Sequence, residues 1–350
     1  MRRVTTLAAA FCAAALVLTS CGGSDDDTTT TPKDDTSSSA AASEIKVGLA
    51  YDIGGRGDQS FNDAAAAGLD KAKSELGVET NEAEAGNGEA ESAKEERLRA
   101  LASAGFNPVI AVGFAYSASV AKVAKELPDT QFAIIDDAAA VGDNIANLLF
   151  AEEQGSFLVG AAAALKSEAG NVGFVGGVEV PLIKKFEAGF RAGAEAVNPD
   201  VEVQVTYLTQ PPDFSGFGDP AKGKTAAAGM YDAGADVVYQ AAGGSGGGVF
   251  EAAQDAGAFA IGVDSDQYNT ADPAVKDVII TSMLKKVDVA VFDFIKSVVD
   301  GNFAAGPVTY DLEKDGVGYS TSGGQVDDIA DQLEEFKTQI IAGDITVPTE

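Results

Sequence analysis

Acidic side chains follow several short apolar runs that are typical of buried strands. They are Asp52, Asp136, Asp137 and Asp264. A carboxylate at the end of a strand can accept two hydroxyl groups of one vicinal diol, and two such carboxylates can act as general acid and general base. One of the neighbours Asp136 and Asp137 is expected to be only a turn residue. These residues therefore predict a site for a polar ligand or for acid–base chemistry.

The composition narrows that chemistry. The 350-residue chain has no His, and its only Cys residues are Cys12 and Cys21. Residues 22–350 therefore lack an imidazole base, a nucleophilic thiol and a zinc-thiolate site. The spacing after Asp264 does not fit a calcium loop, and we expect no metal and no cofactor. A formal charge of −30 repels phosphate backbones, which argues against nucleic acid as a partner.

Two further groups of residues at strand ends could reach the same ligand. Gly243 and Gly244 begin a glycine-rich run whose backbone N–H groups can approach a ligand, although a flexible connector explains that run equally well. Lys285 and Lys286 close another expected strand. Either lysine could reach a cleft, while a solvated position at a helix start is the commoner case for Lys.

Two motifs resemble phosphate-binding loops, and neither is accepted. The loop 52–62 has two glycines of a dinucleotide-binding pattern without the third, and its acidic side chains would repel a pyrophosphate. Ser60 in this loop is expected as the N-cap of the next helix. Residues 218–225 match the pattern G-x-x-x-x-G-K-T. No buried strand directly precedes them, so ATP binding is rejected.

Short β-branched runs alternate with Ala-rich amphipathic stretches from residue 45 onward. Strands are expected at 45–51, 108–112, 131–135, 144–150, 172–175, 202–207, 236–239, 259–263, 277–281 and 308–312, and helices at 62–76, 117–126, 152–166, 183–197, 225–233, 249–256, 286–299 and 326–341. This alternation predicts βαβ units and an α/β fold of two doubly wound parallel-sheet lobes around a cleft. Ligands of such sheets bind at the carboxyl ends of the strands.

The predicted organisation has four parts. Residues 1–20 have a basic start and a short apolar run, as in an export signal peptide, and 21–43 form a Ser/Thr/Asp-rich tether expected to be disordered. The first lobe is expected at 44–148 plus about 265–300, and the second at 149–264 plus about 301–350. Leu18 to Cys21 resembles a lipobox, which predicts lipidation of Cys21 and a location on the extracytoplasmic face of the cell membrane; an ordinary secretory signal is the alternative.

Five stretches together resemble the basic membrane protein family of substrate-binding lipoproteins, which includes purine nucleoside receptors. They are Val47 to Asn62, Asn147 to Ala164, Gly173 to Val203, Phe217 to Lys224 and Ile261 to Asp288. The resemblance implies a type I periplasmic-binding-protein fold, an ABC importer with permease and ATPase subunits as partner, and a monomeric binding protein rather than an enzyme.

The resemblance also implies a nucleoside site. Phe61 and Phe217 would stack on the two faces of the base, with Phe214 competing for the role of Phe217. The remaining implied site residues are Asn62 beside Phe61, Asp52 and Asp136 at the polar edges of the base, Asp264 at the ribose diol, and Gly243 or Gly244 with Lys285 in support.

Two other functions stay open. A sugar receptor of the same fold could use Phe61 and Phe217 as platforms for a pyranose ring. An exported hydrolase of glycosidic or N-glycosidic bonds could use Asp136 and Asp264 as its acid and base.

Overall fold

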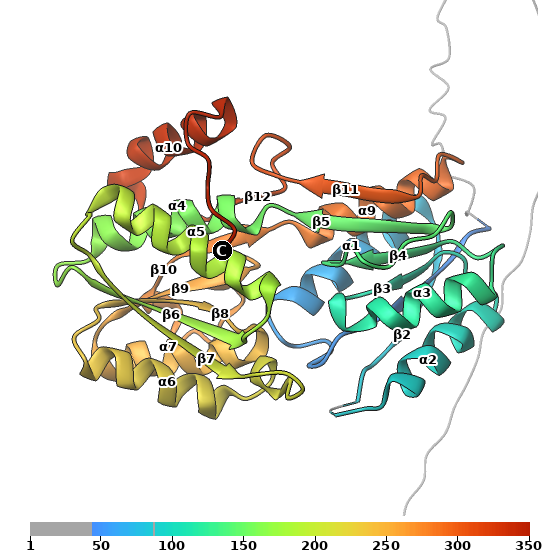
Figure 1. The fold of residues 1–350 in the computed structure, drawn as a ribbon, viewed down its shortest axis with the longest axis horizontal. Helices are drawn as coiled ribbons and strands as arrows, with labels where there is room; N and C mark the ends of the chain where they lie inside the picture. The colour runs from blue at the N-terminus through green and yellow to red at the C-terminus, as the bar shows by residue number, and fades with distance from the viewer. Residues whose placement is uncertain (1–43, 87) are drawn as a thin grey trace, which may run out of the picture. The chain divides into compact units, whose positions relative to one another are not determined.

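The computed structural model describes residues 44–86 and 88–350, and these fall within one compact unit of the chain (Figure 1). The expected signal peptide (1–20), the tether (21–43) and the expected lipidation site Cys21 lie outside the described residues.

The first sheet has six strands, all parallel. Their spatial order is β11 (Gly306–Tyr310), β5 (Ile145–Phe150), β4 (Phe132–Ile135), β3 (Val109–Ala111), β1 (Lys46–Ala50) and β2 (Glu79–Ala83). The central strands are fully buried because helices cover both faces, which is why they read as continuous apolar runs.

The second sheet also has six strands, and β12 alone among them is antiparallel. Their order is β12 (Val317–Tyr319), β10 (Ile279–Lys285), β9 (Phe259–Asp264), β8 (Val237–Ala241), β6 (Asn171–Val178) and β7 (Glu202–Thr209). The two mainly parallel sheets confirm the predicted α/β class.

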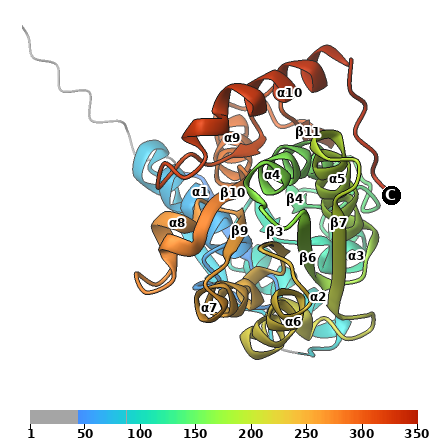
Figure 2. The ribbon, with the colours of Figure 1, turned by 90° about the vertical axis from the view of Figure 1, so that its left-hand side faces the viewer.

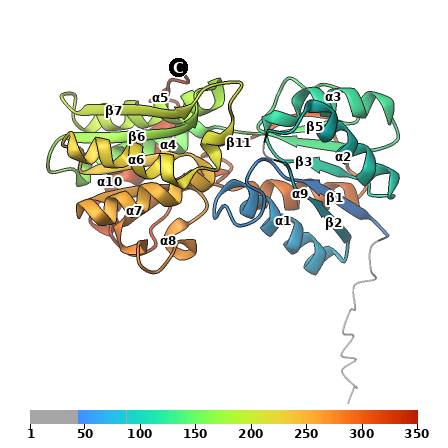
Figure 3. The ribbon, with the colours of Figure 1, turned by 90° about the horizontal axis from the view of Figure 1, so that it is seen from below.

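Helices cover the faces of both sheets. They are α1 (Phe61–Leu76), α2 (Glu91–Ser103), α3 (Ser117–Glu126), α4 (Glu152–Lys166), α5 (Pro181–Val197), α6 (Pro220–Asp232), α7 (Gly246–Ala256), α8 (Gln267–Thr270), α9 (Val287–Val299) and α10 (Ala330–Ala342). On the first sheet, α1 with α9 and α2 with α3 lie on opposite faces (Figure 3). On the second, α4 with α5 and α6 with α7 do the same (Figure 2). We call each sheet with its helices a lobe.

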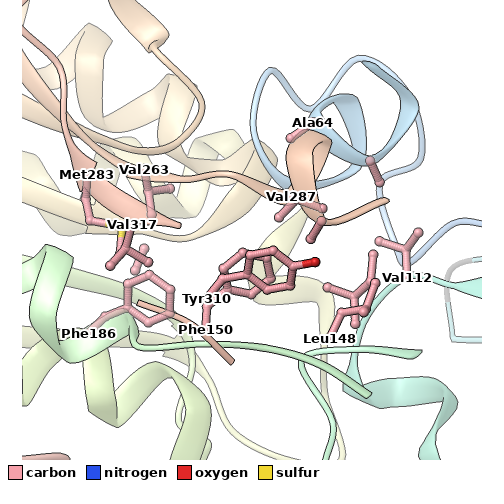
Figure 4. Close-up of a cluster of buried hydrophobic side chains, with 14 of the residues drawn as sticks. Ala64, Val112, Leu148, Phe150, Phe186, Val263, Met283, Val287, Tyr310 and Val317 are labelled. Atoms are coloured by element: carbon pink, nitrogen blue, oxygen red, sulfur yellow. The ribbon is translucent and has the colours of Figure 1, made fainter. Parts of the chain in front are cut away.

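The chain crosses between the lobes three times, after β5, after β10 and after β11. The crossing segments are hydrogen-bonded to one another: Ala151 N donates to Tyr310 O (3.0 Å) and Lys286 N donates to Gly316 O (2.9 Å). The rings of Phe150 and Tyr310 stack beside them with centroids 5.3 Å apart (Figure 4). Three adjacent crossings at one edge of both sheets form a hinge about which the lobes can move.

The crossings correct the expected lobe boundaries. The sequence predicts residues 265–285 in the first lobe, but β10 pairs in register with β9 and lies in the second sheet. It predicts residues 301–310 in the second lobe, but β11 pairs with β5 in the first. After β5, the chain returns to the first lobe only from α9 to β11. Strand pairing, not sequence order, decides which sheet a strand joins.

Candidate functional site

A pocket lies between the lobes, where strands of both sheets end. The space within it, counted out to its open mouth, is about 580 Å³. Its lining residues are Asp52, Ile53, Asp58, Phe61, Asn62, Phe114, Asp136, Leu182, Ile183, Phe186, Phe217, Ala241, Gly243, Val263, Asp264 and Lys285.

Eight of the nine predicted ligand-binding residues line this pocket. Gly244 does not line it; it lies directly beside it, because a Cβ built on Gly244 would come within 3.5 Å of Phe217 O and 3.9 Å of Asp58 Cβ. Residues from positions 52 to 285 thus meet in one place, as expected for strand ends that face each other across a cleft.

Asp52 lies in the loop that follows β1. Its Oδ1 accepts a hydrogen bond from Ile53 N (2.8 Å), and its backbone N donates to Asn62 Oδ1 (3.0 Å). Gly113 packs against the Asp52 carboxyl, since a Cβ on Gly113 would lie 2.3 Å from Asp52 Oδ2. Burial raises the pKa of Asp52 to about 6. The carboxyl is therefore held in a fixed place at the pocket wall.

The expected capping role of Ser60 is wrong. Its side chain makes no cap bond to α1, and Asp58 instead accepts from the backbone N–H groups of Asn62 (2.8 Å) and Asp63 (3.1 Å). Ser60 Oγ donates to Asp264 Oδ2 of the other lobe (2.6 Å). A partner more than 200 residues away in the chain outcompetes the local cap.

Asp264 ends β9 and joins the lobes at the pocket. Its backbone has a φ of 62°, which turns the carboxyl out of the strand direction. Asp136, at the end of β4, has a φ of 65°. Both acids occupy the same kind of position in their two sheets. Burial raises the pKa of Asp264 to about 6, although the Lys285 charge and the Ser60 hydroxyl oppose that shift.

Lys285 is the buried cation of the pocket. Its Nζ lies 2.5 Å from Asp136 Oδ2 and 3.1 Å from Glu152 Oε1, and its side chain is 2% exposed. Burial alone would lower the pKa of Lys285, but these carboxylates and Asp264 reverse the effect and raise it. Burial raises the pKa of Asp136 to about 7 despite the lysine. The other oxygen, Asp136 Oδ1, is buried without a hydrogen-bond partner.

The structure distinguishes the members of two pairs of adjacent residues that the sequence leaves open. Lys285 enters the pocket, whereas Lys286 pairs with Asp315 at the surface. Asp137 is the turn residue, accepting from Ala139 N and Ala140 N.

Phe217, not Phe214, lines the pocket. Its ring packs over Gly177, where an added Cβ would lie 2.4 Å from a ring carbon. The backbone of β6 therefore supports the ring on one side.

Four phenylalanines line the pocket, and only Phe61 and Phe217 are predicted from the sequence. Phe114 follows β3 and Phe186 lies on the first turns of α5, after β6. Phe114 could have been found by the same rule as the others, because it follows closely on the end of β3 at Ala111. Phe186 could not, because β6 ends at Val178 and Phe186 lies within α5. Lys285 Nζ lies 5.1 Å from the Phe61 ring centroid and 5.5 Å from that of Phe186, within cation–π range.

The phosphate-loop match at 218–225 is confirmed as accidental. A 3-10 turn, Ser215–Phe217, precedes it in place of a strand. Asp219 caps α6 by accepting from Lys222 N (3.1 Å). Among the described residues, no cluster of His, Cys, Asp and Glu is arranged to hold a metal ion. None of the helices described is long and apolar enough to cross a bilayer.

The pocket can hold a flat, apolar-faced molecule that carries hydrogen-bond donors. Its walls are aromatic and aliphatic, and its polar groups are mainly carboxylates, which accept hydrogen bonds. The one lysine is already paired with two carboxylates.

Comparisons with known proteins agree with this architecture. Residues 45–350 match the family model for ABC transporter substrate-binding proteins of the PnrA-like (Bmp) type. The ABC transporter nucleoside-binding protein BmpA of Lactococcus lactis is 33% identical, over 88% of this chain and 90% of its own length. An uncharacterized lipoprotein of Pyrococcus abyssi is 35% identical, over 79% of this chain and 69% of its own.

A solved structure extends the match to the fold. The crystal structure of an ABC transporter solute-binding protein from Aeropyrum pernix K1 superposes with a TM-score of 0.75 at 33% identity, over 87% of this chain and 94% of that one. The two lobes therefore have the type I periplasmic-binding-protein fold. With its matched length and its strand-end pocket, the chain belongs to the PnrA-like family of ABC transporter substrate-binding proteins.

Proposed function

We propose that this protein captures a purine nucleoside in the pocket between its lobes and delivers it to the permease of an ABC importer. The observation that carries the proposal is the placement of Phe61 and Phe217, which line one pocket from opposite lobes together with Asp52, Asp136 and Asp264. Aromatic rings on both sides hold a planar base, and carboxylates recognise its N–H groups and the ribose hydroxyls.

Each polar residue has a role in this proposal. Asp136 Oδ1, buried and without a partner, accepts from a donor on the base, and Asp52 accepts from another edge. Asp264 accepts the two hydroxyls of the ribose, supported by Lys285 and by Gly243 or Gly244. Asn62 holds the Asp52 backbone through its Oδ1 and lies at the pocket wall.

The pocket selects against anionic ligands. Four carboxylates, Asp52, Asp58, Asp136 and Asp264, line it, and a phosphate group would add like charge to that set. A neutral nucleoside, with donors and no phosphate, fits the proposal better than a nucleotide.

Delivery follows from the hinge. Ligand bridging the two lobes stabilises the closed arrangement, and the closed protein is the form that docks on the permease. We propose that the mature protein acts as a monomer, attached to the outer face of the cell membrane by lipid on Cys21. It performs no turnover.

Calorimetry and thermal shift on a chain of residues 44–350 test the proposal, with adenosine, guanosine, inosine, hypoxanthine, adenosine monophosphate, ribose and galactose. Binding of the nucleosides and not of the sugars or the nucleotide is the expected result. Binding of a sugar alone would replace the nucleoside by a pyranose. Release of free base during long incubation would make the protein a hydrolase.

A further inference from the structure

An aromatic contact joins the two lobes beside the ligand pocket. The rings of Phe114 and Phe214 lie with their centroids 6.0 Å apart at an interplanar angle of 59°. Phe114 belongs to the first lobe, in the 3-10 turn after β3, and Phe214 belongs to the second, in the loop after β7. Both side chains are partly exposed, so this contact is within reach of solvent.

The contact lies away from the hinge. β7 forms one edge of the second sheet. β12, which follows the third crossing between the lobes, forms the other edge. In Figure 1 the crossing strands β5 and β11 pass near the top of the view, and β7 ends in its lower half. A contact at that edge must break when the lobes rotate apart about the hinge.

Each ring is directly connected to the pocket. Phe114 itself lines it. Phe214 begins the turn that carries Phe217 into the pocket: Phe217 N donates to Phe214 O (3.3 Å), and Gly218 N donates to Ser215 O (3.0 Å). A position of Phe214 fixed against the first lobe therefore also fixes the Phe217 ring.

We propose that Phe114 and Phe214 form an aromatic gate, a pair of positioning residues that holds the cleft closed over the ligand and sets its dissociation rate. The gate forms whenever the lobes close, in the ligand-free protein and over a bound ligand. Its loss makes the liganded protein open more readily and therefore accelerates dissociation. Aromatic pairs of this geometry predict dissociation about two- to tenfold faster in Phe214→Ala.

The first measurement needs no ligand. Residues 44–350 contain no Cys, so spin labels on Ser92→Cys in α2 and Ala221→Cys in α6, both exposed, report the separation of the lobes alone. Phe214→Ala is expected to increase the population with longer label distances. Phe214→Tyr, which keeps the ring, is expected to restore the parent distribution.

Phe303→Ala is the matched control. It removes an aromatic edge contact of 6.2 Å with Phe294, within the first lobe, and is expected to leave the label distances unchanged. Melting curves of the ligand-free variants check that each one folds. A parent-like distance distribution in Phe214→Ala would overturn the gate.

The second measurement is the dissociation of adenosine by stopped flow, and its ligand rests on the proposed function. Dissociation that is equally fast in the double variant Phe114→Ala/Phe214→Ala and in Phe114→Ala would show that the two rings act together, whereas additive effects would overturn the gate. If the parent does not bind adenosine but Phe214→Ala opens the lobes, the proposed ligand fails and the gate stands. If the parent binds and Phe214→Ala changes neither distance nor rate, the gate fails and the ligand stands.

Discussion

Lys285 and Asp136 connect the two lobes through an ion pair of 2.5 Å at the inner end of the pocket. Lys285 ends β10 in the second sheet and Asp136 follows β4 in the first, so the pair forms only when the sheets face each other. Glu152, which begins α4 directly after the first crossing, completes the group at 3.1 Å.

Removing this lysine leaves the buried carboxylate of Asp136 without its cation, while Glu152 keeps its pair with Lys185. Lys285→Met is therefore expected to lower the free energy of unfolding by about 3–5 kcal/mol at pH 7.5 and to weaken ligand binding. Urea denaturation of the ligand-free protein measures the first effect. Lys286→Met, which loses only a surface pair with Asp315, is the control and should change stability by less than about 1 kcal/mol. Equal losses in the two variants would contradict the buried pair.

Stability is expected to rise as the pH falls from 8 to 5. Burial raises the pKa of Asp52 and of Asp264 to about 6 and that of Asp136 to about 7, against an ordinary value of 3.8. The folded state therefore binds protons more tightly than the unfolded state, and this contribution is complete at low pH and is lost as the pH rises through 6 to 7. Urea midpoints across this range measure it in ligand-free protein.

Asp52→Asn isolates one of these carboxyls. Asparagine can still accept the hydrogen bond from Ile53 N, but it has no charge to bury. We expect higher stability at pH 8, a flatter dependence on pH, and weaker binding of a ligand that donates to Asp52. Asp143→Asn, at an exposed carboxylate, should keep the parent slope. An unchanged slope in Asp52→Asn would mean that Asp52 binds protons equally in both states.

Ser60→Ala removes the hydroxyl that bridges the lobes at Asp264. Ser60 is fully buried, and its loss leaves a carboxylate oxygen without a donor, at an expected cost of about 1–3 kcal/mol. The Ser60 hydroxyl lowers the pKa of Asp264, so its removal should raise that pKa. As the pH falls, Asp264 then becomes protonated, and ligand binding weakens, at a higher pH in the variant than in the parent. Ser74→Ala, on the exposed face of α1, is the control. Parent-like stability together with an unchanged pH profile would remove Ser60 from the site.

Phe217→Ala is expected to weaken nucleoside binding by roughly 5- to 150-fold, because a stacked base gains about 1–3 kcal/mol from an aromatic partner. Its melting temperature without ligand should stay near that of the parent, since the ring is only partly buried. Isothermal calorimetry measures the change. Normal affinity in the variant would place the base elsewhere.

Gly177→Ala tests the position of the same ring without removing it. The new methyl would lie 2.4 Å from Phe217 Cδ1, so the ring must move. We expect weaker binding than in the parent. Gly229→Ala on α6, where an added Cβ meets nothing within 4 Å, is the matched control and should bind normally. Equal affinities would show that the ring position does not matter to the ligand.

Many features of the fold and of the site follow from local sequence. Buried parallel strands have continuous apolar sequences, and strand ends in an α/β protein mark the ligand site, so Asp52, Asp136 and Asp264 are predictable from the sequence alone. The strand Glu79–Ala83 could not, because its sequence ETNEA has no apolar run; it becomes a strand by pairing with β1 at a sheet edge.

The α/β class, the strand ends that line the pocket and the lack of His and Cys chemistry in residues 44–350 follow from the amino-acid sequence. The choice of Lys285 over Lys286, the pairing of Ser60 with Asp264 and the place of β10 in the second lobe depend on the folded structure. One cause explains all three. A lysine is buried, or a serine leaves its helix cap, only when a partner from far along the chain compensates for it, and local spacing carries no record of that partner.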